Sequence, residues 1–123
     1  MPHHVEFDSE TGIVCITYAG DITLDMVRQA SGDAWDLAKS RGTRCFLSEF
    51  QDADIKLTVS DLMQIDKHFE SLGISRDIKS AILVPDDTKI AEDSALHEHF
   101  GTSRSWQIKT FFNRSEAIEW LLS

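Results

Sequence analysis

Five aspartates follow predicted strands and carry the side chains best suited to binding a metal ion. Because the carboxyl ends of parallel strands meet at one edge of a sheet, where open α/β sheets tend to bind ligands, we expect these residues to gather there. Several carboxylates at one place could hold a hard cation such as Mg²⁺ and support metal-assisted catalysis. The alternative needs no ligand, since turns and helix starts favour aspartate for backbone reasons. The five are Asp21, Asp52, Asp54, Asp86 and Asp87.

The histidines and cysteines do not form a recognisable catalytic set. His97 and His99 are two residues apart on a predicted helix, so they point about 200° away from each other. Asp93 and His97 are four apart, but zinc needs three or four ligands. Cys15 and Cys45 each lie in an apolar, strand-like segment. They are predicted to be buried, reduced thiols, with a disulfide between neighbouring strands as the alternative.

The sequence also lacks the common catalytic and cofactor-binding motifs. It contains no G-x-S-x-G elbow, no P-loop and no G-x-G-x-x-G fingerprint. We therefore expect no cofactor and favour a protein that is not an enzyme.

The length and net charge of the chain limit the number of domains and the classes of partner. The 123 residues suit one domain, spanning residues 1–123. The formal net charge is −9, which repels nucleic acid and anionic membrane surfaces, so basic proteins, cations and neutral ligands remain as partners. No apolar run approaches the length of a membrane span, and the first residues lack a signal pattern. The expected location is the cytoplasm.

The segment from Lys79 to Pro85 predicts a strand in the interior of a sheet. Ala81 to Val84 are apolar at every position, which is typical of a strand buried on both faces. Other strands are predicted at Val5–Phe7, Ile13–Tyr18, Arg44–Phe50 and Trp106–Phe112. Gly20-Asp21 is expected to end the second strand, and Gln51–Lys56 is expected to form a turn.

Four helices are predicted between and after these strands. The first begins after Thr23 as N-cap and ends at Gly42. The second begins after Thr58, has Asp61 at the capping-box position and ends at Gly73. The third covers residues 86–100, and the last begins at Asn113.

The order β-β-α-β-α-β-α-β-α predicts an α/β fold with one mixed, mostly parallel five-stranded sheet and four helices, in which only the first strand is antiparallel. The predicted core consists of Val14, Ile16, Phe46, Leu47, Leu62, Phe69, Ile82, Leu83, Val84, Ile108, Trp120 and Leu121.

This element order, together with G-D-I-T-L-D at residues 20–25 and F-F-N-R-S-E-A-I-E-W-L at residues 111–121, resembles the SpoIIAA-like proteins. These are small bacterial proteins related to the STAS domain of anti-sigma-factor antagonists, with an architecture shared by Sec14-type lipid-binding domains. The resemblance spans the whole chain. It implies the same fold and a non-enzymatic binding or regulatory module that acts through a protein partner. A homodimer also remains open.

The resemblance marks two hydroxyls as candidate phosphoacceptors, Thr58 and Ser60. Signalling STAS domains carry a phosphorylatable serine in a D-S-S-G-like turn at the start of the corresponding helix. This sequence has L-T-V-S-D at residues 57–61 instead. We therefore interpret the Thr58 hydroxyl as a helix cap.

A small lipophilic-ligand-binding protein is the other function that the resemblance suggests. Large aromatic side chains could line an apolar cavity, as in Sec14-like proteins. A pocket of roughly 300 Å³ or more would favour this function, whereas a filled core would count against it. The candidate lining residues are Trp35, Trp106, Phe111, Phe112 and Trp120.

Overall fold

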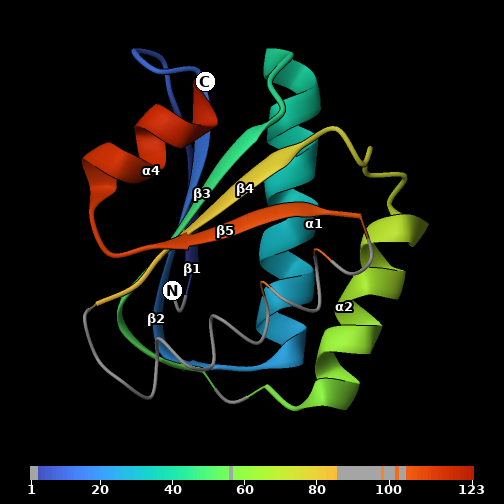
Figure 1. The fold of residues 1–123 in the computed structure, drawn as a ribbon. Helices are drawn as coiled ribbons and strands as arrows, with labels where there is room; N and C mark the ends of the chain where they lie inside the picture. Colours follow the sequence, from blue (N-terminus) through green and yellow to red (C-terminus); the bar gives the residue numbers. More distant parts are fainter. Residues whose placement is uncertain (1–2, 56, 86–97, 99–101, 103–104) are drawn as a thin grey trace.

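The computed structural model describes residues 3–55, 57–85, 98, 102 and 105–123. Five strands form one sheet in the order β1-β2-β3-β4-β5, so strands that follow each other in the chain lie side by side (Figure 1). β1 is antiparallel to β2, and the other neighbouring pairs are parallel. The mixed α/β sheet predicted from the sequence is confirmed. The strands are β1 His3–Asp8, β2 Ile13–Ile22, β3 Cys45–Ile55, β4 Lys79–Leu83 and β5 Gln107–Phe111.

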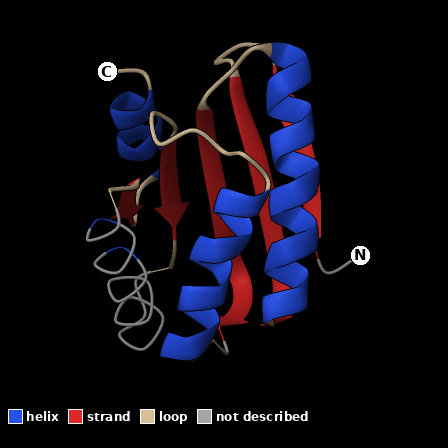
Figure 2. Cartoon of the chain, turned by 90° about the vertical axis from the view of Figure 1, so that its right-hand side faces the viewer, coloured by secondary structure: helices blue, strands red, loops and turns tan. Residues whose placement is uncertain are grey.

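Three helices are described, and they divide between the two faces of the sheet. They are α1 Leu24–Arg41, α2 Val59–Ser71 and α4 Arg114–Leu121. α1 and α2 lie side by side on one face, and α4 lies on the other (Figure 2). The helix predicted over residues 86–100 falls almost entirely outside the described residues, as do Asp93, His97 and His99.

The two helical layers give the protein two buried clusters, because successive side chains of a strand point to opposite faces of a sheet. Val14, Phe46 and Ile82 belong to the larger cluster, under α1 and α2. Leu47 and Leu83 belong to the smaller cluster, under α4. β3 and β4 are thus buried on both faces, as the apolar run of β4 predicts.

The helix starts and ends follow the local sequence signals. The Thr23 hydroxyl accepts a hydrogen bond from the backbone amide of Met26, at 3.4 Å. The Asn113 side chain likewise accepts one from the amide of Glu116, at 3.1 Å. α1 ends at Gly42, whose φ of 68° is in the left-handed region that glycine adopts without strain.

Two predicted strand ends are wrong, because β2 and β3 continue together beyond them. Gly20-Asp21 and residues 51–54 have the composition of turns, yet both segments belong to strands. After a register irregularity between Thr17 and Ala19, Gly20 pairs with Ala53 and Asp21 with Asp54. The two segments satisfy each other's backbone groups, and the burial of Ile22 and Ala53 anchors them to the core.

Two residues of the predicted core are only partly buried. Phe69 packs edge-on against Trp106, with ring centroids 5.5 Å apart. Trp120 lies at the margin of the α4 cluster, with its ring 5.7 Å from that of Phe111. The other predicted core residues are buried. Within the described part of the chain, no helix has both the length and the apolar character of a membrane span.

Candidate functional site

The structure brings two of the five aspartates side by side. Asp21 on β2 and Asp54 on β3 are register partners. Asp52 lies two residues before Asp54 on β3 and pairs with Ala19. Asp86 and Asp87 lie outside the described residues. Among the residues that are described, no three metal-ligating side chains form a group. The sequential strand order also lacks the reversal that opens a ligand crevice in doubly wound sheets, so metal binding stays a prediction from the sequence.

The Thr58 hydroxyl is engaged in a capping box at the start of α2. It accepts a hydrogen bond from the amide of Asp61 at 3.1 Å, and the Asp61 carboxylate accepts one from the amide of Thr58 at 2.9 Å. A phosphate on Thr58 would therefore replace a capping group and meet a carboxylate of like charge. Ser60 is exposed in the first turn. Phosphorylation of either residue stays a prediction.

Substitution of Thr58 by alanine is expected to lower the free energy of unfolding by about 0.5–2 kcal/mol, because the Asp61 amide loses its acceptor. Denaturant melts measure this loss. Ser60→Ala, two residues away on the same exposed turn, is the matched control and should change stability by no more than about 0.5 kcal/mol. Equal effects of the two substitutions would contradict the capping role, and stoichiometric phosphate on either residue in the native source would indicate a regulated switch instead.

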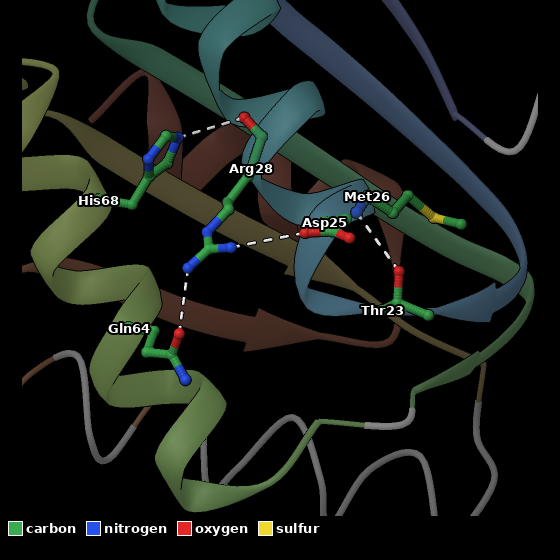
Figure 3. Close-up of polar contacts among 6 residues, drawn as sticks. All are labelled: Thr23, Asp25, Met26, Arg28, Gln64 and His68. Atoms are coloured by element: carbon green, nitrogen blue, oxygen red, sulfur yellow. Dashed lines mark hydrogen bonds and ion pairs between the residues drawn. The ribbon is translucent and has the colours of Figure 1, made fainter.

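A polar bridge ties α1 to α2 (Figure 3). The Arg28 guanidinium donates to the side-chain oxygen of Gln64 at 3.0 Å and to the Asp25 carboxylate at 3.4 Å. A ring nitrogen of His68 lies 3.3 Å from the backbone carbonyl oxygen of Arg28. These contacts hold the two helices together on the surface above the sheet.

An apolar cavity of about 110 Å³ lies between this helix pair and the sheet. The described residues around it are aromatic, aliphatic or neutral polar, and none carries a charge. The cavity is lined by Ile16, Tyr18, Val27, Ser31, Ala34, Trp35, Phe46, Ser48, Phe50, Leu57, Leu62, Ile65, Phe69, Ile74, Ile78, Ser80, Ile82, Trp106, Gln107 and Ile108.

The cavity exists because small residues from three elements face one another. α1 contributes Ser31 and Ala34. On the sheet, Ser48 stands between Ile16 and Ile82 on the neighbouring strands, and Ser80 pairs with Phe46. A larger apolar side chain at any of the serine positions would occupy part of the space.

Four hydroxyls that line the cavity have no hydrogen-bond partner among the described residues. Within the described part of the chain, Ser31, Ser48, Ser80 and Tyr18 form no side-chain hydrogen bond. Tyr18 is only 4% exposed, and its ring stacks on that of Phe50 with the centroids 4.6 Å apart. Burial raises the pKa of Tyr18 because the phenolate would lose its solvation. None of these hydroxyls is among the fully buried, unpaired side-chain atoms of the described residues, which are His3 Nδ1 and Arg76 Nη1. The hydroxyls therefore face the space of the cavity, where a ligand can bond them.

Tyr18 is the only tyrosine of the chain, so its ionisation can be followed by ultraviolet absorbance. In the native protein, we expect the Tyr18 hydroxyl to stay un-ionised at pH 10.0, the ordinary pKa of a tyrosine, and to titrate only above that pH. The folded state favours the neutral phenol. Its contribution to stability is therefore complete below pH 10.0 and is lost as the pH rises through the raised pKa. The chain in denaturant is the control, and native titration at the ordinary value would contradict the burial of the hydroxyl.

Trp106 lines the cavity, and polar contacts hold its side chain in place. Its indole N–H donates to the Asp66 carboxylate at 2.6 Å, and the Arg76 guanidinium stacks 3.7 Å from the ring centroid. Arg76 in turn bonds Glu70 at 2.8 Å. The charges beside the cavity are thus paired with one another.

Only part of this site could be predicted from the sequence. Of the five candidate lining residues, Trp35 and Trp106 line the cavity. Phe111 and Trp120 lie in the cluster on the opposite face, and Phe112 is exposed. The serines and Tyr18 were missed, although a small polar residue at a core-facing position of a strand, such as Ser48, is a usable signal.

The two thiols lie on the α4 face, away from the cavity. Cys15 is buried, Cys45 is half-buried rather than fully buried as predicted, and both are free. Burial raises the pKa of both thiols. Their nucleophilic thiolate forms are therefore disfavoured.

Native protein should therefore react slowly with a thiol reagent at neutral pH, with Cys45 reacting before Cys15. Denatured protein should label at both positions at once. Mass spectrometry of the labelled peptides gives the two rates. Immediate labelling of native Cys15 would contradict its burial.

The fold is similar to that of a solved protein. A crystal structure of an uncharacterised protein of the DUF3478 family from Shewanella loihica, described as SpoIIAA-like, superposes with a TM-score of 0.61 over 97% of this chain and 91% of that chain. This chain has the SpoIIAA-like fold. The sequences are 16% identical, so the likeness concerns the fold alone. No protein-family model and no curated protein matches the sequence.

Proposed function

We propose that this chain is a non-enzymatic binding protein whose ligand is a small, predominantly apolar molecule held between α1, α2 and the sheet. The cavity beneath the helix pair supports this function, because its described lining is apolar apart from a few neutral polar groups. Such a lining, with a small number of polar groups to orient the ligand, is typical of ligand sites.

The size of the cavity limits the ligand. Pockets for drug-sized molecules have volumes of roughly 300–1,000 Å³. The cavity of about 110 Å³ is well below that range, so it does not support a carrier of whole lipids. It is closer to an engineered apolar cavity of about 150 Å³ that binds benzene.

Native mass spectrometry of protein purified from its source, with solvent extraction of the same sample, tests this function. We expect a small neutral molecule to co-purify and to leave on denaturation. Ser48→Val places methyl groups from the central strand inside the cavity. The substitution should both displace the ligand and raise the melting temperature of the empty protein. Thr17→Val, on the neighbouring strand but exposed on the other face, is the matched control. A Ser48→Val protein that binds as before would rule out this cavity.

A second candidate is a regulatory module that acts through a protein partner. Two apolar side chains four residues apart on α2 support it: Val59 is 55% exposed and Met63 is 43% exposed. Residues at this spacing share one face of a helix. The net charge of −9 favours a partner with a basic surface.

Affinity capture of partner proteins from native lysate, with this chain as the bait, tests the second candidate. The double variant Val59→Ser/Met63→Ser should lose a partner that the wild type retains. Phe112→Ser, at an equally exposed apolar residue outside α2, is the control and should retain it. Identical captured proteins for all three baits would speak against α2 as the interaction surface.

A further inference from the structure

We infer that the ligand of the cavity is a neutral, single-ring aromatic molecule that carries a hydroxyl group, of the chemical class of phenol. This inference rests on the proposed ligand-binding function and narrows it to one class. It is drawn from the volume, the lining and the unpaired hydroxyls of the cavity.

The ring follows from volume and from the aromatic side chains around it. A space of about 110 Å³ suits one six-membered ring better than a fused polycyclic molecule. Trp35, Trp106, Phe46, Phe50 and Phe69 contribute to the lining. Aromatic rings prefer edge-to-face or offset contacts with one another, so a planar aromatic ring gains contacts here that an aliphatic ring of similar size does not.

The hydroxyl group follows from the polar atoms of the cavity. The three serines and Tyr18 present hydroxyls that make no hydrogen bond within the described residues. Each can donate one hydrogen bond and accept others. A hydrocarbon would leave all of them unpaired in an apolar site, which is unfavourable. A ligand hydroxyl can donate to one of them and accept from another.

Ser48 is placed best to hold the ligand hydroxyl. It lies on β3, the central strand, and its register partners on both neighbouring strands are isoleucines that also line the cavity. Ser80 lies on the adjacent strand and faces the same helix layer. Together the two serines place polar groups on the sheet side of an otherwise apolar cavity, where they can orient one end of a ligand.

The neutral charge follows from the absence of any charged group among the described lining residues. Burying an ion without a partner is strongly unfavourable. The Arg76 guanidinium, which stacks on Trp106, pairs through Nη2 with Glu70, and its Nη1 lies 3.6 Å from the Asp66 carboxylate without forming a hydrogen bond. A carboxylate or phenolate ligand would therefore find no unpaired counter-ion among the described lining residues.

Binding of four probes to the intact chain tests the inference, with tryptophan fluorescence and calorimetry as readouts. The probes are phenol, benzene, cyclohexanol and benzoate. Phenol should bind about 3- to 10-fold more tightly than benzene, as expected for one neutral hydrogen bond. Cyclohexanol should bind more weakly than phenol, and benzoate should not bind. In Ser48→Ala the preference for phenol over benzene should fall towards one, with affinity for benzene unchanged. Thr17→Ala should leave all four affinities unchanged.

The outcomes separate this inference from the proposed function. Equal binding of phenol and benzene to the wild type would contradict the inferred hydroxyl group of the ligand. Equal binding of phenol and cyclohexanol would contradict its inferred aromatic ring. Either result leaves a small-ligand site in place. Absence of binding by all four probes would overturn the inference. If, in addition, no molecule co-purified with the wild type, the proposed function would fail as well. If Ser48→Ala does not fold, Ser80→Ala replaces it, with the same expected loss of preference.

Discussion

Replacing Trp106 by alanine is expected to lower the free energy of unfolding by about 3–5 kcal/mol, the range for removing a large aromatic side chain from a core. The indole is buried, stacks on Arg76 and packs edge-on against Phe69. Its removal also takes away the donor to the Asp66 carboxylate. Since a whole domain is stable by only about 5–15 kcal/mol, this loss should be visible in urea melts as a large shift of the midpoint.

Two further variants separate the contributions of Trp106. Trp106→Phe keeps an aromatic ring but removes the N–H, so it should cost about 1–3 kcal/mol through the hydrogen bond that the Asp66 carboxylate loses. Trp120→Ala makes the same change at a half-buried tryptophan on the other face and should cost less than Trp106→Ala. A smaller loss at Trp106 than at Trp120 would contradict its place in the wall of the cavity.

Leu83→Ala should lower the free energy of unfolding by about 2–5 kcal/mol, the range for emptying a packed leucine site. Leu83 is buried under α4, with Glu49 on β3 and Phe111 on β5 as its register partners. The cluster on this face is the smaller of the two, so few neighbours can move in to fill the space. Denaturant melts measure the loss.

Leu122→Ala is the matched control for Leu83→Ala. Leu122 follows α4 and is 55% exposed, so its truncation should change stability by no more than about 0.5 kcal/mol. A loss below about 1 kcal/mol at Leu83 would show that β4 is not an interior strand.

The features predicted well are those that depend on a few adjacent residues. The capping box of Thr58 and Asp61 and the left-handed turn at Gly42 are encoded within one helical turn. The apolar run of β4 is similarly local. For these features, propensity, capping and hydrophobic pattern agree with the final packing.

The features predicted poorly depend on what another segment does. Gly20 and Asp21 look like a strand end, but β3 runs alongside them and pairs their backbone groups. The cavity is another case, because Ser31 and Ser48 are inconspicuous in the sequence and become its lining only when α1 packs on the sheet. Tertiary context overrides local preference at both places.

The sequential order of the strands bears on how the chain acquires its fold during synthesis. Each strand from β2 to β5 pairs with the strand that precedes it in the chain. No strand must wait for a later one to be inserted beside it, so the sheet can grow from one edge as the polypeptide leaves the ribosome, with domains forming from the N-terminal side. Each parallel pair is closed across a single connection between consecutive strands, which is a shorter loop closure than pairing strands from opposite ends of the chain would require. While the sheet grows, β1 stays at one edge, and the other edge belongs to the newest strand until the next strand of the same chain pairs with it.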